Sequence, residues 1–515
     1  MKRKVNQLKA GIALSYATMA VQAIIQIAYT PIMLRLLGKS EYGVYNLVAS
    51  VISYLGLLSF GFGSAYMRFY SIRAAKNDQD GIARLNGMFL TIFTFISIVA
   101  LFCGGVLTAN TEHIFSGGLT EHEIQTAKVL MGIMTFNIAV TFPASVFDSI
   151  VTAHEQYVFQ RTINLLRYLL NPFLTFPLLL MGYGSLALAL ITTVLTIASF
   201  LINIWFCLKK LRIRFLFNKF EKVLFKEICA FSSYMFLNMI TDQVNWNVDK
   251  FILGKIRGSS DVAVYSIAAQ INTMYLSLST AVSTVFIPRI NRIVASKDDN
   301  HELDKLFVKI GRIQFMILSL ILSGFFFFGE YFIQIWAGKE YQGQYQTCYV
   351  ITLLLLIPVT VPLIQNIGIE IQKAKNMHKF RSILYAAIAV ANALISVALC
   401  PKYGGIGCAV GTALALLIGN GFLMNWYYHK YVGLDIIDFW KSIFSIFPSL
   451  ILPVCVGFLI KHFFVITSIS KFLIYIVIYT AVYCFSIWFW AMNSDEKSEI
   501  KNILKKFKRK RVTVR

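Results

Sequence analysis

The sequence predicts an all-α integral membrane protein, and three observations lead to that prediction. Of the 515 residues, 57% are hydrophobic and only 14% are charged. The mean hydropathy is +0.65, and a soluble fold has no core large enough to bury so much apolar surface. The apolar residues also fall into runs of about twenty, which is the length that an α-helix needs to cross a bilayer. The chain is therefore predicted to cross a membrane many times.

Fourteen apolar runs are long enough to span a membrane, which predicts fourteen transmembrane helices. The first run follows Lys2, Arg3 and Lys4 and is too long for the apolar part of a signal peptide, so we expect it to be the first membrane helix. The connections are short, which leaves no room for a separate soluble domain. The runs lie at about 10–34, 43–67, 87–107, 128–150, 162–181, 185–207, 229–254, 262–287, 311–330, 348–370, 383–400, 405–427, 442–460 and 472–492.

The distribution of positive charge predicts the orientation. An even number of helices places both termini on one side, and most Lys and Arg residues fall on that side, including residues 209–214 and 505–511. By the positive-inside rule this side is the cytoplasm. The net charge of +23 is then explained by loops that face anionic lipid head groups. Nucleic-acid binding is not expected, because no compact domain carries these charges.

An internal repeat divides the chain. Residues Gly38 to Tyr45 read Gly-Lys-Ser-Glu-Tyr-Gly-Val-Tyr, and residues Gly258 to Tyr265 read Gly-Ser-Ser-Asp-Val-Ala-Val-Tyr. At the same spacing of about 220 residues, the segment 183–187 returns as 403–407, and Asn171 is matched by Asn392. Several echoes at one spacing indicate a duplication.

The spacing of the repeat predicts how the two copies are arranged. It spans six helices, an even number, so both copies have the same orientation and are related by an axis along the membrane normal. Two bundles of this kind place a substrate path between them and allow alternating access. We therefore expect lobes at 1–215 and 216–435, followed by two further helices and a basic cytoplasmic tail at 436–515.

Polar positions inside the helices are candidate functional sites, because each is costly in lipid and should face protein or a wet cavity. Such residues form a stripe on the first helix and another on the seventh, and the repeat spacing relates Gln22 to Asp242 and Tyr29 to Asp249. The stripes are either cavity linings, which we favour, or hydrogen-bonded helix seams. They comprise Ser15, Thr18, Gln22, Gln26 and Tyr29 on the first helix, and Asn238, Asp242, Asn245 and Asp249 on the seventh.

The four polar residues of the seventh helix are candidates for binding a coupling ion. Asp242 lies near the middle of its helix, where an ionised aspartate costs about 2.5–3.5 kcal/mol on insertion scales. It is either a proton or cation site or the structural partner of a basic residue. Asp249 lies nearer the outer end and, with Lys250, is interpreted as an interfacial ion pair.

Basic residues near the predicted cytoplasmic side are candidates for substrate binding. Asn164, Arg167 and Asn171 share one face of the fifth helix, and Arg68 and Arg161 lie on the same side of the membrane. A guanidinium fork suits phosphate oxygens, although long basic side chains also snorkel to the interface without any ligand. With two glutamines of the first helix, the substrate-binding candidates are Arg68, Arg161, Arg167, Gln22, Gln26, Asn164 and Asn171.

The eight cysteines have no metal-ligand spacing and lie in or beside apolar runs. They are interpreted as core residues, so we expect no disulfide, no metal site and no cofactor.

Several short motifs resemble those of a known family. The sequence reads Leu-Gly at 37–38, Glu-Tyr-Gly at 41–43 and Phe-Gly-Ser-Ala at 62–65, and then Leu-Gly at 253–254 and Val-Tyr at 264–265. With Asp249, these positions resemble the bacterial polysaccharide transporter family. That family includes the Wzx-type O-antigen flippases and belongs to the MOP superfamily, together with the MATE exporters and the lipid II flippase.

The resemblance implies fourteen helices in two lobes with a cationic central cavity. It also implies movement of an undecaprenyl-pyrophosphate-linked oligosaccharide from the cytoplasmic to the periplasmic leaflet of the bacterial inner membrane. The implied partners are this anionic lipid-linked oligosaccharide, membrane lipids, and polysaccharide polymerase or assembly proteins.

Two alternatives remain open at this point. A MATE-like exporter of organic cations shares the architecture, but it would need acids in the first lobe, where the only acid within a span is Asp148. A membrane polysaccharide polymerase or ligase would need catalytic residues in an outer loop. The loop at 108–127 is the one candidate, and its acids and histidines show no recognisable catalytic spacing, so no enzyme activity is expected.

Overall fold

The computed structural model describes residues 7–217, 221–296, 300–375, 377, 379–463 and 468–498, and this part of the chain is helical without a strand. The first half contains α1 (Gln7–Leu37), α2 (Lys39–Ser53), η1 (Tyr54–Ser59), α3 (Phe62–Ala75), α4 (Gln79–Ala109), α5 (Thr111–Phe115), α6 (Glu121–Ala153), α7 (Tyr157–Leu180), α8 (Gly184–Trp205) and η2 (Phe206–Lys210). The remainder contains α9 (Lys222–Ile256), α10 (Ser259–Ser283), η3 (Thr284–Phe286), α11 (Ile287–Ser296), α12 (Asn300–Ala337), η4 (Lys339–Tyr341), α13 (Tyr345–Ile364), α14 (Asn366–Ala374), α15 (Lys379–Leu416), η5 (Leu417–Leu423), α16 (Met424–Tyr427), η6 (Tyr428–Val432), α17 (Ile436–Phe444), α18 (Phe447–Phe463), α19 (Ile469–Ser486) and η7 (Ile487–Ala491).

Twelve helical stretches of the described chain are long and apolar enough to cross a membrane. The prediction of an all-α membrane protein is confirmed, whereas the count of fourteen spans is not. Two predicted runs, 383–400 and 405–427, lie in one helical stretch that bends at Gly404, where φ is 55° and ψ is −136°. The run 262–287 forms α10 and η3, and it is not among the twelve because Ser, Thr, Asn and Gln side chains interrupt its apolar sequence.

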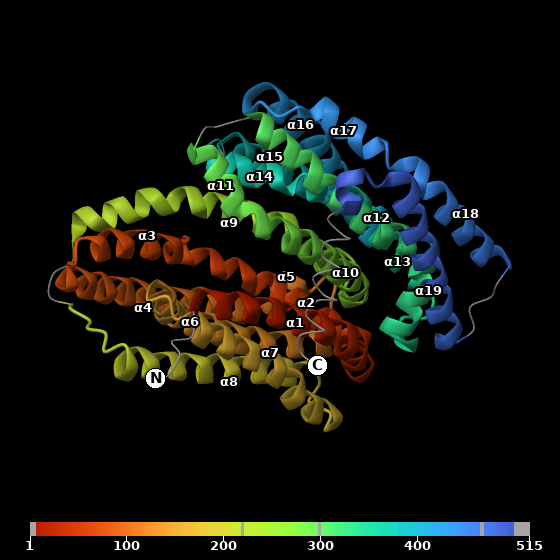
Figure 1. The fold of residues 1–515 in the computed structure, drawn as a ribbon. Helices are drawn as coiled ribbons and strands as arrows, with labels where there is room; N and C mark the ends of the chain where they lie inside the picture. The colour runs from red at the N-terminus through yellow and green to blue at the C-terminus, as the bar shows by residue number, and fades with distance from the viewer. Residues whose placement is uncertain are drawn as a thin grey trace, which may run out of the picture. The chain divides into compact units, whose positions relative to one another are not determined.

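The chain folds into two compact units (Figure 1). The first comprises residues 1–268, 336–347 and 382–415. Within it, α4 packs along α6, α1 along α7 and α6 along α8, and an aromatic core that includes Tyr66, Phe89 and Phe147 is buried between helices. The division of the sequence into two lobes and a tail remains a prediction.

The second unit comprises residues 269–335, 348–381 and 416–515, and a buried ion pair lies inside it. Arg312 Nε of α12 donates to Glu496 Oε1 at 2.8 Å, and both side chains are buried. The same guanidinium donates to the carbonyl oxygens of Ser442 at 2.8 Å and Ala491 at 2.7 Å. A buried pair needs such additional hydrogen bonds to offset its desolvation. Arg312 therefore fastens α17 and the segment after η7 to α12.

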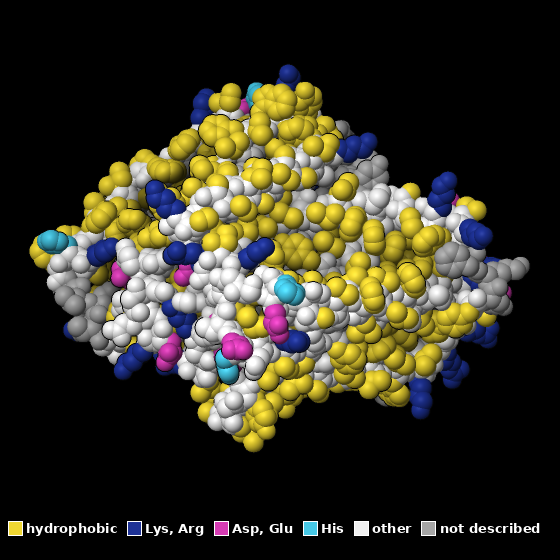
Figure 2. Space-filling view, turned by 180° about the vertical axis from the view of Figure 1, so that it is seen from behind, with side chains coloured by type: hydrophobic (Ala, Val, Ile, Leu, Met, Phe, Trp, Pro, Cys, Tyr) yellow, Lys and Arg dark blue, Asp and Glu magenta, His cyan; other side chains and the backbone are white. Residues whose placement is uncertain are grey.

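The surface carries large apolar side chains, as a lipid-facing surface requires. Phe102, Phe173 and Phe422 are each more than two-thirds exposed. Soluble monomeric proteins rarely expose large contiguous patches of apolar side chains. Figure 2 shows hydrophobic side chains over broad areas of one face, with the charged side chains gathered in groups between them.

The echoes found in the sequence form the same contact twice in the structure. In the first copy, the carboxylate of Glu41 lies against Gly184 and accepts a hydrogen bond from the backbone nitrogen of Ser185 at 2.6 Å. In the second copy, Asp261 lies against Gly404. Both glycines have φ near +54°, at 53° and 55°, a region that glycine occupies without strain. In the first half, the acid of the motif at 38–45 thus contacts the glycine of the motif at 183–187. In the second half, the acid of 258–265 contacts the glycine of 403–407.

Candidate functional site

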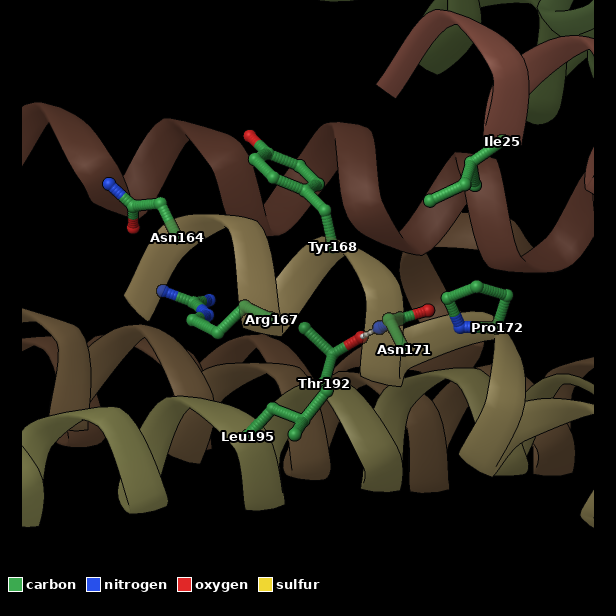
Figure 3. A pocket seen from close by; sticks show the side chains of 8 residues that line it. All are labelled: Ile25, Asn164, Arg167, Tyr168, Asn171, Pro172, Thr192 and Leu195. Atoms are coloured by element: carbon green, nitrogen blue, oxygen red, sulfur yellow. Dashed lines mark hydrogen bonds between the residues drawn. The ribbon is translucent and has the colours of Figure 1, made fainter. Parts of the chain in front are cut away.

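A polar pocket of about 350 Å³ lies between α1, α7 and α8 in the first unit. Figure 3 shows Arg167, Asn164 and Asn171 projecting from α7, with Thr192 of α8 opposite Asn171. The lining residues are Ile25, Asn164, Arg167, Tyr168, Asn171, Pro172, Thr192 and Leu195. The structure therefore brings together the three residues that the sequence placed on one helix face.

The sequence of α7 explains why these side chains share the pocket. Spacings of three and four residues place Asn164, Arg167 and Asn171 on one face of a helix. Pro172 follows directly, and because proline has no backbone N–H, the carbonyl of Tyr168 loses its usual helical partner. The pocket wall therefore combines polar side chains with a helical turn that lacks one backbone hydrogen bond.

Hydrogen bonds to α8 hold two of the polar side chains in place. Arg167 Nη2 lies 3.4 Å from Thr196 Oγ1, and Asn171 Nδ2 donates to Thr192 Oγ1 at 3.3 Å. A guanidinium has five N–H donors, so the single long contact to Thr196 leaves Arg167 with donor capacity for a ligand.

The charges around the pocket favour an anion. Arg167 is the charged residue of the lining, and the lining includes no acid. Asp148 of α6 interacts electrostatically with Arg167 but is not a lining residue, and its carboxylate accepts a hydrogen bond from Asn203 at 2.7 Å. A guanidinium with adjacent amide and hydroxyl groups matches phosphate or carboxylate oxygens.

The other predicted substrate-binding residues lie outside this lining. Gln22 and Gln26 are half-buried on α1, on either side of the lining residue Ile25. Arg161 is exposed near the start of α7. Arg68 is exposed on α3, and its guanidinium carbon lies 4.7 Å from the ring centre of Phe231, a distance at which a cation–π contact forms.

A buried carboxylate forms a second constellation in the same unit. Asp249 of α9 is 2% exposed. Its Oδ2 accepts hydrogen bonds from the Tyr265 hydroxyl at 2.6 Å and from Thr412 Oγ1 at 2.9 Å, and its Oδ1 accepts from Ser396 Oγ at 2.8 Å. The amide oxygen of Asn392 lies 3.2 Å from Thr412 Oγ1 and 3.3 Å from Ser396 Oγ. Five oxygen-bearing side chains from α9, α10 and α15 therefore meet at one buried point.

This burial changes the order of the ion-coupling candidates. The sequence ranked Asp242 above Asp249, but Asp242 is exposed on α9. The sequence interpreted Asp249 as an interfacial pair with Lys250. The charge of Asp249 does act on Lys250, but its carboxylate is also buried and accepts hydrogen bonds from the hydroxyl groups of three residues. Asn245 is half-buried on the same helix, and the side chain of Asn238 lies outside the described part of the structure.

The repeat relates the second constellation to two lining residues of the pocket, Asn171 and Thr192, and to two residues outside its lining, Tyr29 and Thr175. Offsets of 220 or 221 residues relate these four positions, on α1, α7 and α8, to four positions on α9 and on the two segments of α15 that meet at Gly404. The pairs are Tyr29 with Asp249, Asn171 with Asn392, Thr175 with Ser396, and Thr192 with Thr412. The charged residues differ: the first site has Arg167 where the second has Ile388, and the second has Asp249 where the first has Tyr29.

Sequence reasoning identified part of each constellation. The echo between Asn171 and Asn392 pointed to both, but Ser396 and Thr412 were missed. Ser396 follows Asn392 by four residues, one helical turn, so the helix period was a usable signal for it. Among the described residues, no group of three or more His, Cys, Asp or Glu side chains is placed to hold a metal ion.

The helices of this chain form a fold that is similar to solved structures of membrane transporters. A lipid II flippase, MurJ, in an inward closed conformation matches with a TM-score of 0.72 and 18% identity, covering 92% of this chain and 98% of that chain. An inward-facing multidrug resistance MATE family transporter of the MOP superfamily matches with a TM-score of 0.65 and 13% identity, covering 82% and 98%. At these identities the matches show the fold.

The chain belongs to a family described as polysaccharide biosynthesis protein, whose model matches residues 32–346, more than half of the sequence. A Shigella flexneri protein provisionally named an O-antigen transporter is 21% identical over 421 residues, covering 80% of this chain and 95% of the relative. The membrane protein EpsK of Bacillus subtilis (strain 168), which is uncharacterized, is also 21% identical over 421 residues. The predicted membership of the polysaccharide transporter family is confirmed.

Proposed function

We propose that this protein is a flippase that moves an undecaprenyl-pyrophosphate-linked oligosaccharide from the cytoplasmic to the periplasmic leaflet of a bacterial inner membrane. Family membership supports the class of substrate, and the fold of MurJ supports the class of movement. The observation that carries the proposal is the exchange of charge between the two repeat-related sites, an arginine in one and a carboxylate in the other.

The first-half pocket receives the anionic part of the substrate. Arg167 supplies a charge-assisted contact to pyrophosphate or an acidic sugar, and Asn164, Asn171 and Thr192 supply neutral hydrogen bonds. The prenyl chain needs no polar path, because it remains in the bilayer while the head group crosses. Arg68 and Arg161 attract the head group from the cytoplasmic side.

The second-half constellation binds a coupling cation at Asp249. A carboxylate with three hydroxyl groups and an amide oxygen offers the oxygen ligands that a hard cation prefers, and a proton bound to the carboxylate has the same acceptors. Binding of the cation in one half and of the anion in the other couples the two fluxes, provided that both favour the same conformation.

A MATE-like exporter of cationic compounds is less consistent with this structure. Such a substrate needs an acid in the first-half pocket, whereas the charged residue in its lining is Arg167. The alternative of a polymerase or ligase requires catalytic residues in the loop at 108–127. There, Glu123 is occupied in capping α6 and in hydrogen bonds to two serines.

The experiment that tests the proposal follows lipid-linked sugar in cells that lack the protein. We expect the undecaprenyl-pyrophosphate-linked oligosaccharide to accumulate on the cytoplasmic leaflet and to return to the periplasmic leaflet when the wild-type gene is restored. If the oligosaccharide reaches the periplasmic leaflet at the same rate without the protein, the proposed function is wrong. If the pool instead remains one repeat unit long and already faces outward, the protein lengthens the glycan and is an enzyme.

A further inference from the structure

Glu123, at the start of α6, joins three helix ends. One carboxylate oxygen, Oε2, accepts hydrogen bonds from the backbone nitrogen of Thr120 at 2.9 Å and from its hydroxyl at 3.0 Å. The first of these bonds, together with the one that the backbone nitrogen of Glu123 donates to Thr120 Oγ1 at 3.4 Å, forms the capping box of α6. The other oxygen, Oε1, accepts a hydrogen bond from Ser40 Oγ at 2.5 Å and another from Ser259 Oγ. The capping box alone does not require either serine.

The two serines belong to the two copies of the repeated motif. Ser40 lies in the first turn of α2, in the first copy, and Ser259 begins α10, in the second copy. A single carboxylate therefore bonds the first half of the repeat to the second. Glu41, the neighbour of Ser40, accepts its hydrogen bond from the backbone of Ser185 within the first half and so does not join the two halves.

Glycines allow the backbones of the two halves to touch beside these hydrogen bonds. A Cβ atom at Gly43 of α2 would collide with the carbonyl group of Ser259, and one at Gly118 would collide with the carbonyl oxygen of Gly254. Leu47, one turn further along α2, is fully buried and packs against Gly254. Besides the hydrogen bonds to Glu123, the charge of Asp261 in the second copy acts on Lys39 in the first, which adds an electrostatic attraction between the halves.

We propose that Glu123 is a latch that holds the repeat halves together at this end of the helices and releases them when the transport path opens there. In the closed state its carboxylate accepts one hydrogen bond from each half. When α10 moves away from α2, the bond to Ser259 is lost while the capping box of α6 persists, so the latch opens without unfolding the helix end. The predicted topology places this end outside the cytoplasm.

The first test measures exposure of the buried contact, and it does not depend on the substrate. Leu47→Cys serves as the reporter in purified full-length protein in nanodiscs, in a background whose native cysteines are shown to be silent to a water-soluble maleimide. Glu123→Gln is the test variant because glutamine retains the capping box and removes the charge. Glu121→Gln is the matched control, since Glu121 lies exposed in the same helical turn.

A charge-assisted hydrogen bond that is partly exposed shifts a two-state equilibrium by roughly three- to tenfold. We therefore expect Glu123→Gln to increase the labelling rate of Cys introduced at position 47 by that factor, and Glu121→Gln to leave it unchanged. Equal rates in the two variants would overturn the latch. Because neither result involves a lipid-linked sugar, failure here is distinct from failure of the proposed function.

The second test locks the latch. In the double variant Ser40→Cys with Ser259→Cys, oxidation is expected to form a disulfide that stops transport, and a reductant is expected to restore it, whereas each single variant transports with or without oxidant. If the cross-linked protein transports at the rate of the reduced protein, the halves do not separate at this point and the proposal is wrong.

Discussion

The two polar sites related by the repeat share a framework and differ in charge. Each has an asparagine and a threonine at equivalent positions, which are Asn171 and Thr192 in the first half and Asn392 and Thr412 in the second. The first half forms a pocket of about 350 Å³ with Arg167 in its wall. The second half is closed around Asp249, which is 2% exposed and fully hydrogen-bonded.

Under the proposed function, the duplication has produced two sites that bind ligands of opposite charge. A neutral framework of amides and hydroxyls binds either sign of charge, because hydroxyls donate and accept. The single charged side chain then decides which ion binds. Three predictions below test this difference, from the largest expected effect to the smallest, and a fourth tests the orientation of the chain.

The largest effect is expected at Asp249. Asp249→Asn removes the charge that binds the cation and leaves three hydroxyl groups around a weaker acceptor. Since a hydrogen bond to a charged group is worth about 1.5–3 kcal/mol, we expect cation-driven transport to fall by roughly a hundredfold or more. Transport in proteoliposomes with an imposed ion gradient measures this.

The matched control is Asp242→Asn, on the same helix but exposed. If Asp242 binds the coupling ion, which is one of the two interpretations of the sequence, this variant loses its dependence on the ion gradient. If it does so and Asp249→Asn does not, the coupling site is at Asp242 and the buried cluster is structural.

At Arg167 we expect a smaller loss. Arg167→Ala removes one charge-assisted contact to the head group, worth about 1.5–3 kcal/mol, so transport should slow by roughly ten- to a hundredfold. Arg167→Lys should recover part of the rate, because the charge survives but the bidentate fork does not. Arg161→Ala is the comparison: this exposed arginine of the same helix is proposed to attract the head group without lining the pocket, so its loss should slow transport less. An equal loss in both arginine variants would indicate general attraction rather than a binding pocket.

A pair of equivalent threonines sharpens the comparison. Thr412 donates to the Asp249 carboxylate at 2.9 Å, whereas Thr192 accepts from the neutral Asn171 amide at 3.3 Å. A neutral hydrogen bond is worth about 0.5–1.5 kcal/mol, so Thr192→Val should change transport by less than about tenfold, and Thr412→Val by more. Transport rates at matched expression decide the order. A larger effect at Thr192 would contradict the assignment of the charged ligand site to the second half.

The orientation prediction changes labelling only and leaves transport intact. A cysteine introduced at Gly117, between α5 and α6, should react with an impermeant reagent from outside intact cells, and one at Asn77, between α3 and α4, should not. The excess of Lys and Arg on the side of Asn77 is the reason. Labelling at Asn77 from outside would reverse the assignment of the two ends.

Local patterns predicted the helices and one face of the pocket. Every predicted apolar run is mainly helical, although short turns interrupt 43–67, 348–370 and 442–460. Such runs can be predicted because hydrophobic length is a property of a continuous segment. Asn164, Arg167 and Asn171 were predicted together because the helix period places them on one face. Tyr168 and Thr192 were not predicted, since the pocket arises where α1, α7 and α8 meet, and a single sequence does not give that packing.

Asp249 shows the limit most clearly. Its position along the helix suggested an interfacial residue, but its environment comes from Tyr265, Ser396 and Thr412, which lie 16, 147 and 163 residues away in the chain. Asp242 was ranked higher because it lies nearer the middle of the predicted membrane helix. The position of a residue along a helix does not show which side chains of other helices surround it. The repeat was the one sequence signal that reached across this distance, through the match of Asn171 with Asn392.

The central claim is that the two equivalent sites bind ions of opposite sign, and substrate binding to the purified protein tests it most directly. The measurement is the affinity for decaprenyl pyrophosphate in nanodiscs, with and without the coupling cation or at two pH values, in Arg167→Ala and Asp249→Asn. We expect Arg167→Ala to weaken binding by roughly ten- to a hundredfold while binding still responds to the cation. Asp249→Asn should bind with an affinity that no longer responds to it. If Asp249→Asn remains cation-dependent while Arg167→Ala binds as wild type does, the division of roles between the two sites is wrong.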